Sequence, residues 1–220
     1  MYKRIIYRAQ KYKGCAFGHF IPELLTGEEP TCVDIKFLTE DDFNQFSKSI
    51  SNTNETSQIV PLYDHSKCTS LTINVSDQPV YVNCYYPIGH AHNYMTYGID
   101  FDINALIVEA QNSVEDETIF NRPPESGLVF KVDPVLLSKF PERLSITKIM
   151  SNIHNRKLDC IGVMLFDTFP QHSCFSQELT HICYDRHSPI GQFFHDHLTQ
   201  CKKIGFKNIN NCDNADCWLH

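Results

Sequence analysis

The sequence predicts an α+β protein in which helices pack on a central antiparallel sheet. Between residues 58 and 110, short segments of alternating apolar residues have the length and pattern of strands. Outside this stretch, several segments have the apolar spacing of amphipathic helices. A composition with 42% hydrophobic and 12% aromatic residues is ordinary for a globular protein. The 220 residues are enough for one main folded unit with a full core.

The first third combines short apolar segments with one well-marked helix. We expect a strand at 4–9 and an alternating stretch at 32–38. A helix follows from Thr39 to about Ile50, because Thr39 can cap the first turn and the acids after it favour the positive end of the helix dipole.

The remaining elements follow from periodicity and turn residues. Strands are expected at 58–63, 70–75, 80–85, 92–97, 105–110 and, after a proline-marked turn, 128–132. Helices are expected at 134–139, 145–155, 175–184 and 190–200. The segment 161–166 fits either a strand or a buried helix, and the tail from 208 to 220 is expected to be irregular.

Charge and hydropathy limit the partners and the compartment. The formal net charge is −7 with only 19 Lys and Arg, and no stretch concentrates the cations that phosphate backbones need, so nucleic acid is not the expected partner. No segment has the length of a membrane span or the apolar run of a signal peptide. We therefore expect a soluble protein of a reducing intracellular compartment, whose ten cysteines are mostly free thiols.

Cys174 is the candidate nucleophile. A thiol attacks as the thiolate, and a nearby imidazole and a helix N-terminus lower its pKa. Cys174 directly precedes the helix expected from Phe175, whose first-turn N–H groups would also face an anionic intermediate.

The base and its orienting group are expected from the sheet. A strand at 92–97 that returns as 105–110 would form a hairpin and bring Glu109 back to the level of His92. Glu109 would then orient the imidazole of His92 and leave its other nitrogen to take the thiol proton. His90 lies on the same face of the strand and is an alternative base.

The order of these segments resembles the circularly permuted NlpC-like papain-fold hydrolases, which are related to lecithin-retinol acyltransferases. The matching pieces are His92 to Gly98, Leu106 to Ala110, Leu158 to Phe166 and Cys174 to Leu179. The resemblance covers roughly residues 78–190, so it implies a papain-like domain at 78–220 and an N-terminal extension at 1–77 packed on it.

The resemblance implies cleavage or transfer of an amide, thioester or lipid acyl group through an acyl-enzyme, on a protein or lipid substrate, without a cofactor or a metal. The Cys-Ser-Glu-Leu signature of the family is not intact, because Phe175 and Ser176 follow Cys174, and a gapless register places Ser176 at the nucleophile's position. Either Cys174 attacks from a longer turn or the site is degenerate.

Two other functions fit parts of the sequence. Arg8, Ser70, Glu115 and Glu117 occur in the Arg, Ser, Glu-x-Glu order of ADP-ribosyltransferases, a resemblance that implies transfer of ADP-ribose from NAD. A non-catalytic, zinc-stapled interaction module would use soft-ligand pairs. Its candidate ligands are His172 with Cys174, His181 with Cys183, and the cluster of Cys212, Cys217 and His220.

Overall fold

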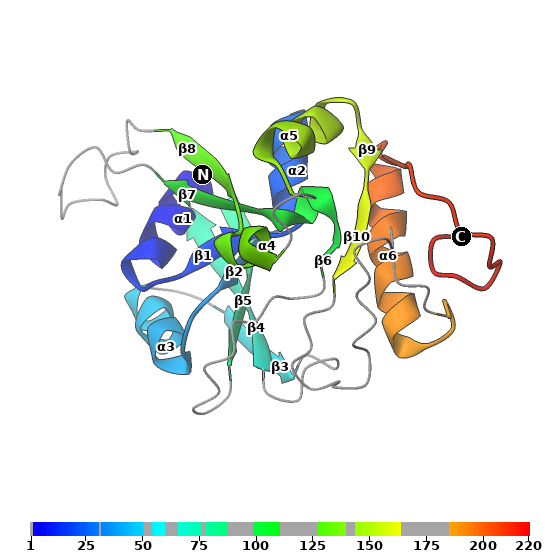
Figure 1. Cartoon of the computed structure of the whole chain (residues 1–220). Helices are drawn as coiled ribbons and strands as arrows, with labels where there is room; N and C mark the ends of the chain where they lie inside the picture. Colours follow the sequence, from blue (N-terminus) through cyan, green and yellow to red (C-terminus); the bar gives the residue numbers. More distant parts are fainter. Residues whose placement is uncertain are drawn as a thin grey trace. The chain divides into compact units, whose positions relative to one another are not determined.

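The computed structural model of the chain has an α+β fold. It describes residues 2–30, 32–50, 54–59, 66–75, 78–87, 99–110, 127–139, 144–163 and 185–220. These residues form two compact units, drawn in Figure 1. The first comprises Met1–Leu24, Glu28–Met95 and Leu106–Asp133, and the second comprises Leu25–Gly27, Thr96–Ala105 and Pro134–His220.

The first unit is built on a seven-stranded sheet with the strand order β3-β4-β5-β2-β1-β7-β8. The strands are β1 (Cys15–Phe17), β2 (Val33–Lys36), β3 (Asn54–Ile59), β4 (Ser66–Val75), β5 (Gln78–Pro87), β7 (Leu106–Ala110) and β8 (Leu128–Val132). Its helices are α1 (Tyr2–Lys11), α3 (Glu40–Ser49) and most of α2 (Phe20–Thr26).

The sheet is mixed, which corrects the expectation of a purely antiparallel one. β2 and β5 pair in parallel, while the other pairs of this sheet are antiparallel. β4 and β5, on either side of the domain boundary expected at residue 77, pair along their whole length. The first 77 residues therefore share one sheet with the residues that follow.

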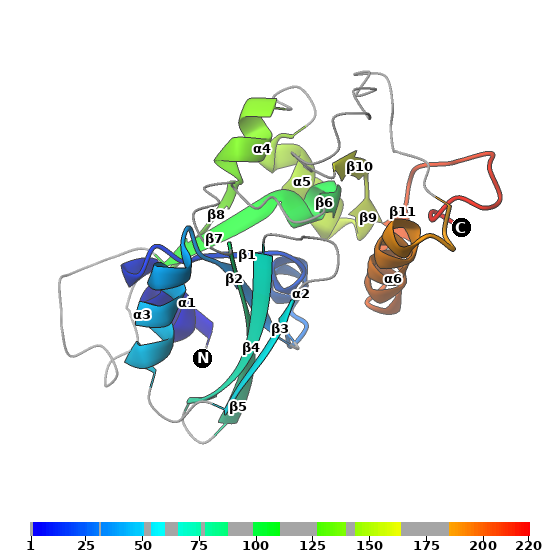
Figure 2. The same cartoon turned by 90° about the horizontal axis from the view of Figure 1, so that it is seen from below.

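Helices α1 and α3 lie side by side and cover one face of this sheet (Figures 1 and 2). Phe43 of α3 stacks on Tyr86 of β5 with ring centroids 4.2 Å apart, and Phe37 lies edge-on to Phe43 at 5.9 Å. Ile6 and Ala9 of α1 are completely buried. Burial of these apolar side chains is the main stabilising term of the unit.

The strand expected at 4–9 is wrong, because these residues belong to helix α1. Ile5, Ile6 and Ala9 are buried and fit one face of a helix, and the helix packs on β1 and β7. A short apolar run does not distinguish a strand from a buried helix, so packing against the sheet decides its conformation.

The predicted start of α3 is confirmed. Thr39 has an extended backbone, and its hydroxyl oxygen accepts a hydrogen bond from the backbone N–H of Asp42 at 3.1 Å. Glu40, Asp41 and Asp42 occupy the first turn, where negative charge complements the helix dipole.

Replacing Thr39 by Ala is expected to lower the free energy of unfolding by about 1 kcal/mol, because a first-turn N–H loses its partner. Ser145 supplies a matched control, since it caps α5 without a side-chain hydrogen bond to that helix. Chemical denaturation should show a clearly smaller loss for Ser145→Ala. Equal losses in both variants would contradict the role given to the Thr39 hydroxyl.

The described residues of the second unit combine short strands with three α-helices and one 3-10 helix. Its strands are β6 (Ile99–Phe101), β9 (Lys157–Leu158), β10 (Cys160–Val163) and β11 (Lys207–Asn208), and its helices are η1 (Asp102–Ala105), α4 (Pro134–Lys139), α5 (Ile146–His154) and α6 (Pro189–Lys203). β6 pairs with β10, and β9 pairs with β11. Trp218 is fully buried against Phe194 and Phe101, with ring centroids 5.0 and 5.8 Å away.

Most of the other expected elements that fall on described residues are confirmed. The strands at 70–75, 80–85, 105–110 and 128–132 correspond to β4, β5, β7 and β8, and the helices at 134–139, 145–155 and 190–200 correspond to α4, α5 and α6. The strand expected at 58–63 is displaced, since β3 ends at Ile59, and β1 and α2 were not expected. The elements expected at 92–97 and 175–184 lie outside the described residues.

None of the helices within the described ranges is long and apolar enough to cross a membrane.

Candidate functional site

The two faces of the seven-stranded sheet differ in chemical character. On β2, Val33 and Ile35 are buried under the helices, whereas Asp34 and Lys36 alternate with them and are partly exposed. The same alternation runs through β5 and through residues 69–74 of β4, whereas β1 and β7 are buried except at Cys15 and Glu109. We call the second face the polar sheet face, and its main polar members are Cys15, Asp34, Lys36, Ser70, Asn83, Tyr85 and Glu109.

A hydrogen-bonded row crosses three strands of the polar sheet face. Register places Ser70 of β4, Asn83 of β5 and Asp34 of β2 side by side. The Ser70 hydroxyl donates to Asn83 Oδ1 at 2.9 Å, and Asn83 Nδ2 donates to Asp34 Oδ1 at 3.0 Å. Tyr85 also donates its hydroxyl hydrogen to Asp34 Oδ1, at 3.5 Å. These contacts fix the orientation of the Asp34 carboxylate.

The other oxygen of Asp34 lies against a glycine turn. Gly18 follows β1 and has φ +89°, a conformation that L side chains rarely adopt. A Cβ built on Gly18 would lie 3.0 Å from Asp34 Oδ2. Glycine therefore allows the main chain after β1 and the carboxylate of β2 to approach each other closely.

Two lysine–carboxylate pairs lie further along the polar sheet face. Lys36 pairs with Asp133, which directly follows β8, and its ammonium group lies 5.5 Å from the centre of the Phe17 ring. Lys131 of β8 binds Glu109 of β7. The face therefore presents positive as well as negative groups, and each of these lysines is paired with a carboxylate.

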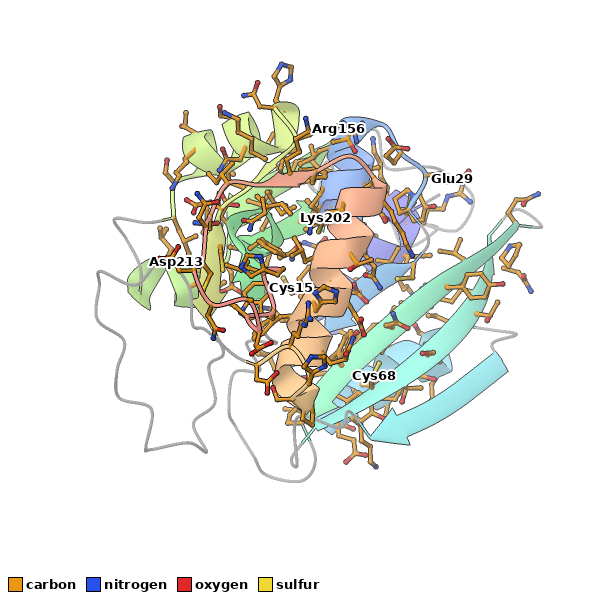
Figure 3. The ribbon with its side chains drawn as sticks, turned by 90° about the vertical axis from the view of Figure 1, so that its right-hand side faces the viewer. Cys15, Glu29, Cys68, Arg156, Lys202 and Asp213 are labelled. Atoms are coloured by element: carbon orange, nitrogen blue, oxygen red, sulfur yellow. The ribbon has the colours of Figure 1, made fainter. Side chains whose placement is uncertain are left out.

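The thiols of Cys15 on β1 and Cys68 on β4, labelled in Figure 3, are not reactive thiolates. Burial raises the pKa of Cys15 to about 11, although the charge of Lys36 opposes the shift. Burial also raises the pKa of Cys68 to about 11, and the nearby Asp34 charge acts in the same direction. Both groups are protonated at neutral pH, so neither can serve as an activated nucleophile.

Of the predicted catalytic trio, only Glu109 falls within the described part of the chain. Cys174, His92 and the alternative base His90 lie outside it. Glu109 is on β7, where its side chain is 36% exposed and accepts a hydrogen bond from Lys131. β7 is flanked by β1 and β8, so the expected hairpin between 92–97 and 105–110 is wrong.

The structure does not bring together the described residues of the ADP-ribosyltransferase set. Arg8 is on α1 and donates to the side-chain and main-chain oxygens of Ser49, at 3.0 and 2.6 Å. Ser70 is on the polar sheet face, opposite the face that α1 and α3 cover. Glu115 and Glu117 lie outside the described residues.

The described part of the chain contains no group of three or more His, Cys, Asp or Glu side chains able to hold a metal ion. In the C-terminal cluster, Cys217 is fully buried and His220 Nε2 lies 2.7 Å from the main-chain oxygen of Cys212. His172, Cys174, His181 and Cys183 are outside the described ranges.

The second unit contains a buried carboxylate of a different kind. Asp102 is completely buried and accepts hydrogen bonds from Asn152 Nδ2 at 2.8 Å and from the backbone N–H of Asp159 at 3.1 Å. Burial raises its pKa to about 6, although the two hydrogen bonds oppose the shift. Asp159 and Lys148 contribute smaller effects of opposite sign.

This shift predicts how stability changes with pH. Because the pKa of Asp102 rises from 3.8 to about 6 on folding, its contribution to stability is fully present below about pH 4 and is lost as the pH rises through 6. The wild-type minus Asp102→Asn difference in unfolding free energy should therefore fall by up to about 3 kcal/mol between pH 4 and 7.

Denaturation of both proteins across this pH range measures the change. The control is Asp213→Asn, which alters an exposed carboxylate of the C-terminal loop (Figure 3). For this variant, the difference in unfolding free energy from the wild type should change much less with pH. A pH-independent difference for Asp102→Asn would contradict the raised pKa.

Sequence reasoning missed Asp34, Asn83 and Gly18. The only available signal was the alternation of 32–38, which places Asp34 and Lys36 on one side of a short strand. The contact between Asp34 and Asn83 joins residues 49 positions apart in the sequence, and periodicity does not encode such pairings.

No protein-family model matches the chain, and no curated protein matches it at a significant level. Similar solved structures include a complex of CCA-adding enzyme with CTP (TM-score 0.41, 14% identity, 71% of this chain and 32% of that chain). Another is the apo form I of CCA-adding enzyme (TM-score 0.39, 11% identity, 72% of this chain and 32% of that chain). The chain thus spans about a third of the length of these solved chains, and likeness at this level assigns neither a family nor an activity to it.

Proposed function

We propose that the polar sheet face binds a magnesium-bound polyphosphate group at Gly18 and Asp34. The close approach of the Gly18 main chain to the Asp34 carboxylate carries this proposal. Glycine turns that follow a strand let phosphate oxygens reach the backbone, because no Cβ blocks the approach.

The carboxylate of Asp34 suits a hard divalent cation, and its second oxygen, Oδ2, is not the one that accepts from Asn83 and Tyr85. Mg²⁺ binds proteins through one or two carboxylates and takes its other ligands from water and substrate phosphates. A cation that arrives with its phosphates needs few protein ligands, which is compatible with the lack of a three-ligand cluster in the described residues. Lys36, two residues along β2 on the same face, is paired with Asp133, and its ammonium group has further N–H donors that can bind a phosphate oxygen.

Isothermal titration calorimetry of the full chain with magnesium tripolyphosphate tests the proposal. Asp34→Asn should weaken binding at least about tenfold, since it removes the charge that meets the cation. Glu109→Gln is the matched control, because it neutralises a carboxylate of the same face two strands away, and it should bind like the wild type. Absence of binding to the wild type, or equal binding by Asp34→Asn, would rule the site out.

We propose cysteine-dependent acyl hydrolysis or transfer, in the permuted papain-like arrangement, as a second function. One observation favours it: Glu109 is partly exposed, and a carboxylate that already binds Lys131 can accept further hydrogen bonds, for instance from an imidazole. In this proposal Cys174 is the nucleophile, His92 the base and Glu109 the orienting group.

A thiol-directed electrophile followed by peptide mass spectrometry tests this second proposal. Cys174 should be labelled ahead of the other nine cysteines, and His92→Ala should remove the preference. Cys15 and Cys68 are internal references, because their raised pKa values predict slow labelling. Uniform labelling of all cysteines would count against a thiol hydrolase.

A further inference from the structure

We infer that Tyr81 stacks on the base of a nucleotide whose phosphates occupy the Gly18–Asp34 site, an inference that rests on the proposed polyphosphate binding. It specifies the ligand as a nucleoside polyphosphate and assigns Tyr81 as the residue that recognises the nucleoside.

Tyr81 is unusual among the described residues because it is an aromatic side chain turned to solvent. The residue is 56% exposed, the largest fraction among the exposed large hydrophobic residues of the described part of the chain. The other four in that group are aliphatic, namely Leu38, Leu137, Ile146 and Ile209. A regular strand holds the Tyr81 backbone in place, since it lies within β5 and pairs with Thr72 of β4.

Strand geometry places Tyr81 beside the proposed phosphate site. Side chains alternate along a strand, so Tyr81 lies on the same face as Asn83 and Tyr85, the two β5 residues that contact Asp34. Tyr81 and Asn83 are two residues apart on β5, and two residues of a strand span about 7 Å. The Tyr81 ring is therefore the next side chain after Asn83 on this face of the strand. A nucleotide has a ribose between its phosphates and its base, and this spacing lets the base reach Tyr81 while the phosphates remain at Asp34.

An exposed aromatic ring on a rigid strand is a suitable stacking surface. Every base has a π-face, so stacking on Tyr81 tolerates different bases, and the ring contributes affinity without a base-specific hydrogen bond. Removal of such a ring usually weakens binding by about tenfold or more. Inorganic tripolyphosphate has no base and should be insensitive to Tyr81.

The test compares two ligands on three forms of the full chain by calorimetry. Wild-type protein should bind magnesium ATP more tightly than magnesium tripolyphosphate. Tyr81→Ala should weaken ATP binding about tenfold and leave tripolyphosphate binding unchanged, whereas Tyr81→Phe, which keeps the ring, should bind both ligands like the wild type. Tyr81 is largely exposed, so both variants should fold, and circular dichroism checks this.

The outcomes distinguish a failure of the stacking role of Tyr81 from a failure of the proposed polyphosphate site. If the wild type binds both ligands and Tyr81→Ala weakens neither, or weakens both equally, the stacking role is overturned while the polyphosphate site stands. If the wild type binds neither ligand, the polyphosphate site and the stacking role are both overturned. A selective loss of ATP binding in Tyr81→Ala, restored in Tyr81→Phe, supports the assignment.

Discussion

Replacing Trp218 by Ala should lower the free energy of unfolding by about 3–5 kcal/mol. Trp218 is fully buried in the second unit, where its ring contacts Phe194 of α6 and Phe101 of β6. These three rings come from segments far apart in the sequence, so the cavity left by the substitution would loosen α6, β6 and the C-terminal segment together. The main-chain oxygen of Trp218 also lies 3.1 Å from Nδ1 of His195, so Trp218 contacts α6 through its backbone as well as through its ring.

Urea denaturation followed by far-ultraviolet circular dichroism measures the loss. Ile209→Ala is the control in the same C-terminal segment, since Ile209 is about half exposed and its truncation should cost about 1 kcal/mol or less. A Trp218→Ala protein with the unfolding midpoint of the wild type would show that the aromatic cluster does not stabilise this unit.

Replacing Gly18 by Ala should have the second largest effect, and it should act on both stability and ligand binding. The residue has φ +89°, where a side chain costs about 1–2 kcal/mol. The new Cβ would also lie 3.0 Å from Asp34 Oδ2 and push the carboxylate away from its position beside Asn83. We expect a loss of about 2–3 kcal/mol in unfolding free energy and loss of tripolyphosphate binding.

Gly27→Ala separates the two causes. Gly27 has a similar φ of +78°, but a Cβ there meets nothing within 4 Å among the described atoms. It should therefore show the backbone cost alone, with ligand binding retained. If calorimetry finds tripolyphosphate binding unchanged in Gly18→Ala, or equally weakened in both glycine variants, the close approach of Gly18 to Asp34 does not form the site.

The sequence predicts some of the structural features behind these effects and not others. Local signals identified the Thr39 cap and the strands β4, β5, β7 and β8. Both kinds of signal, the capping residue and the two-residue period of a strand, depend only on residues close together in the sequence. They failed for α1, where Ile5 and Ile6 are compatible with a strand and only packing on β1 and β7 selects the helix.

The residues of the candidate site were harder to predict from the sequence than the helices and strands were. Glu109 was singled out correctly as the end of a buried strand, but its partner is Lys131 of β8, because β8 rather than the preceding segment pairs along β7. The sequence did not indicate Asp34 as a site residue, because a single acidic residue in a short alternating segment is common. It becomes a candidate through Gly18, Asn83 and Tyr85, which three other parts of the chain supply.

The amino-acid sequence by itself therefore determined the α+β class, most strand and helix positions, and the alternation that gives β2, β4 and β5 one apolar and one polar side. The tertiary structure alone decided the parallel pairing of β2 with β5 and the place of β7 between β1 and β8. The physical reason is that periodicity and capping act between near neighbours, whereas strand order and register depend on burying the apolar side of the whole sheet beneath α1 and α3.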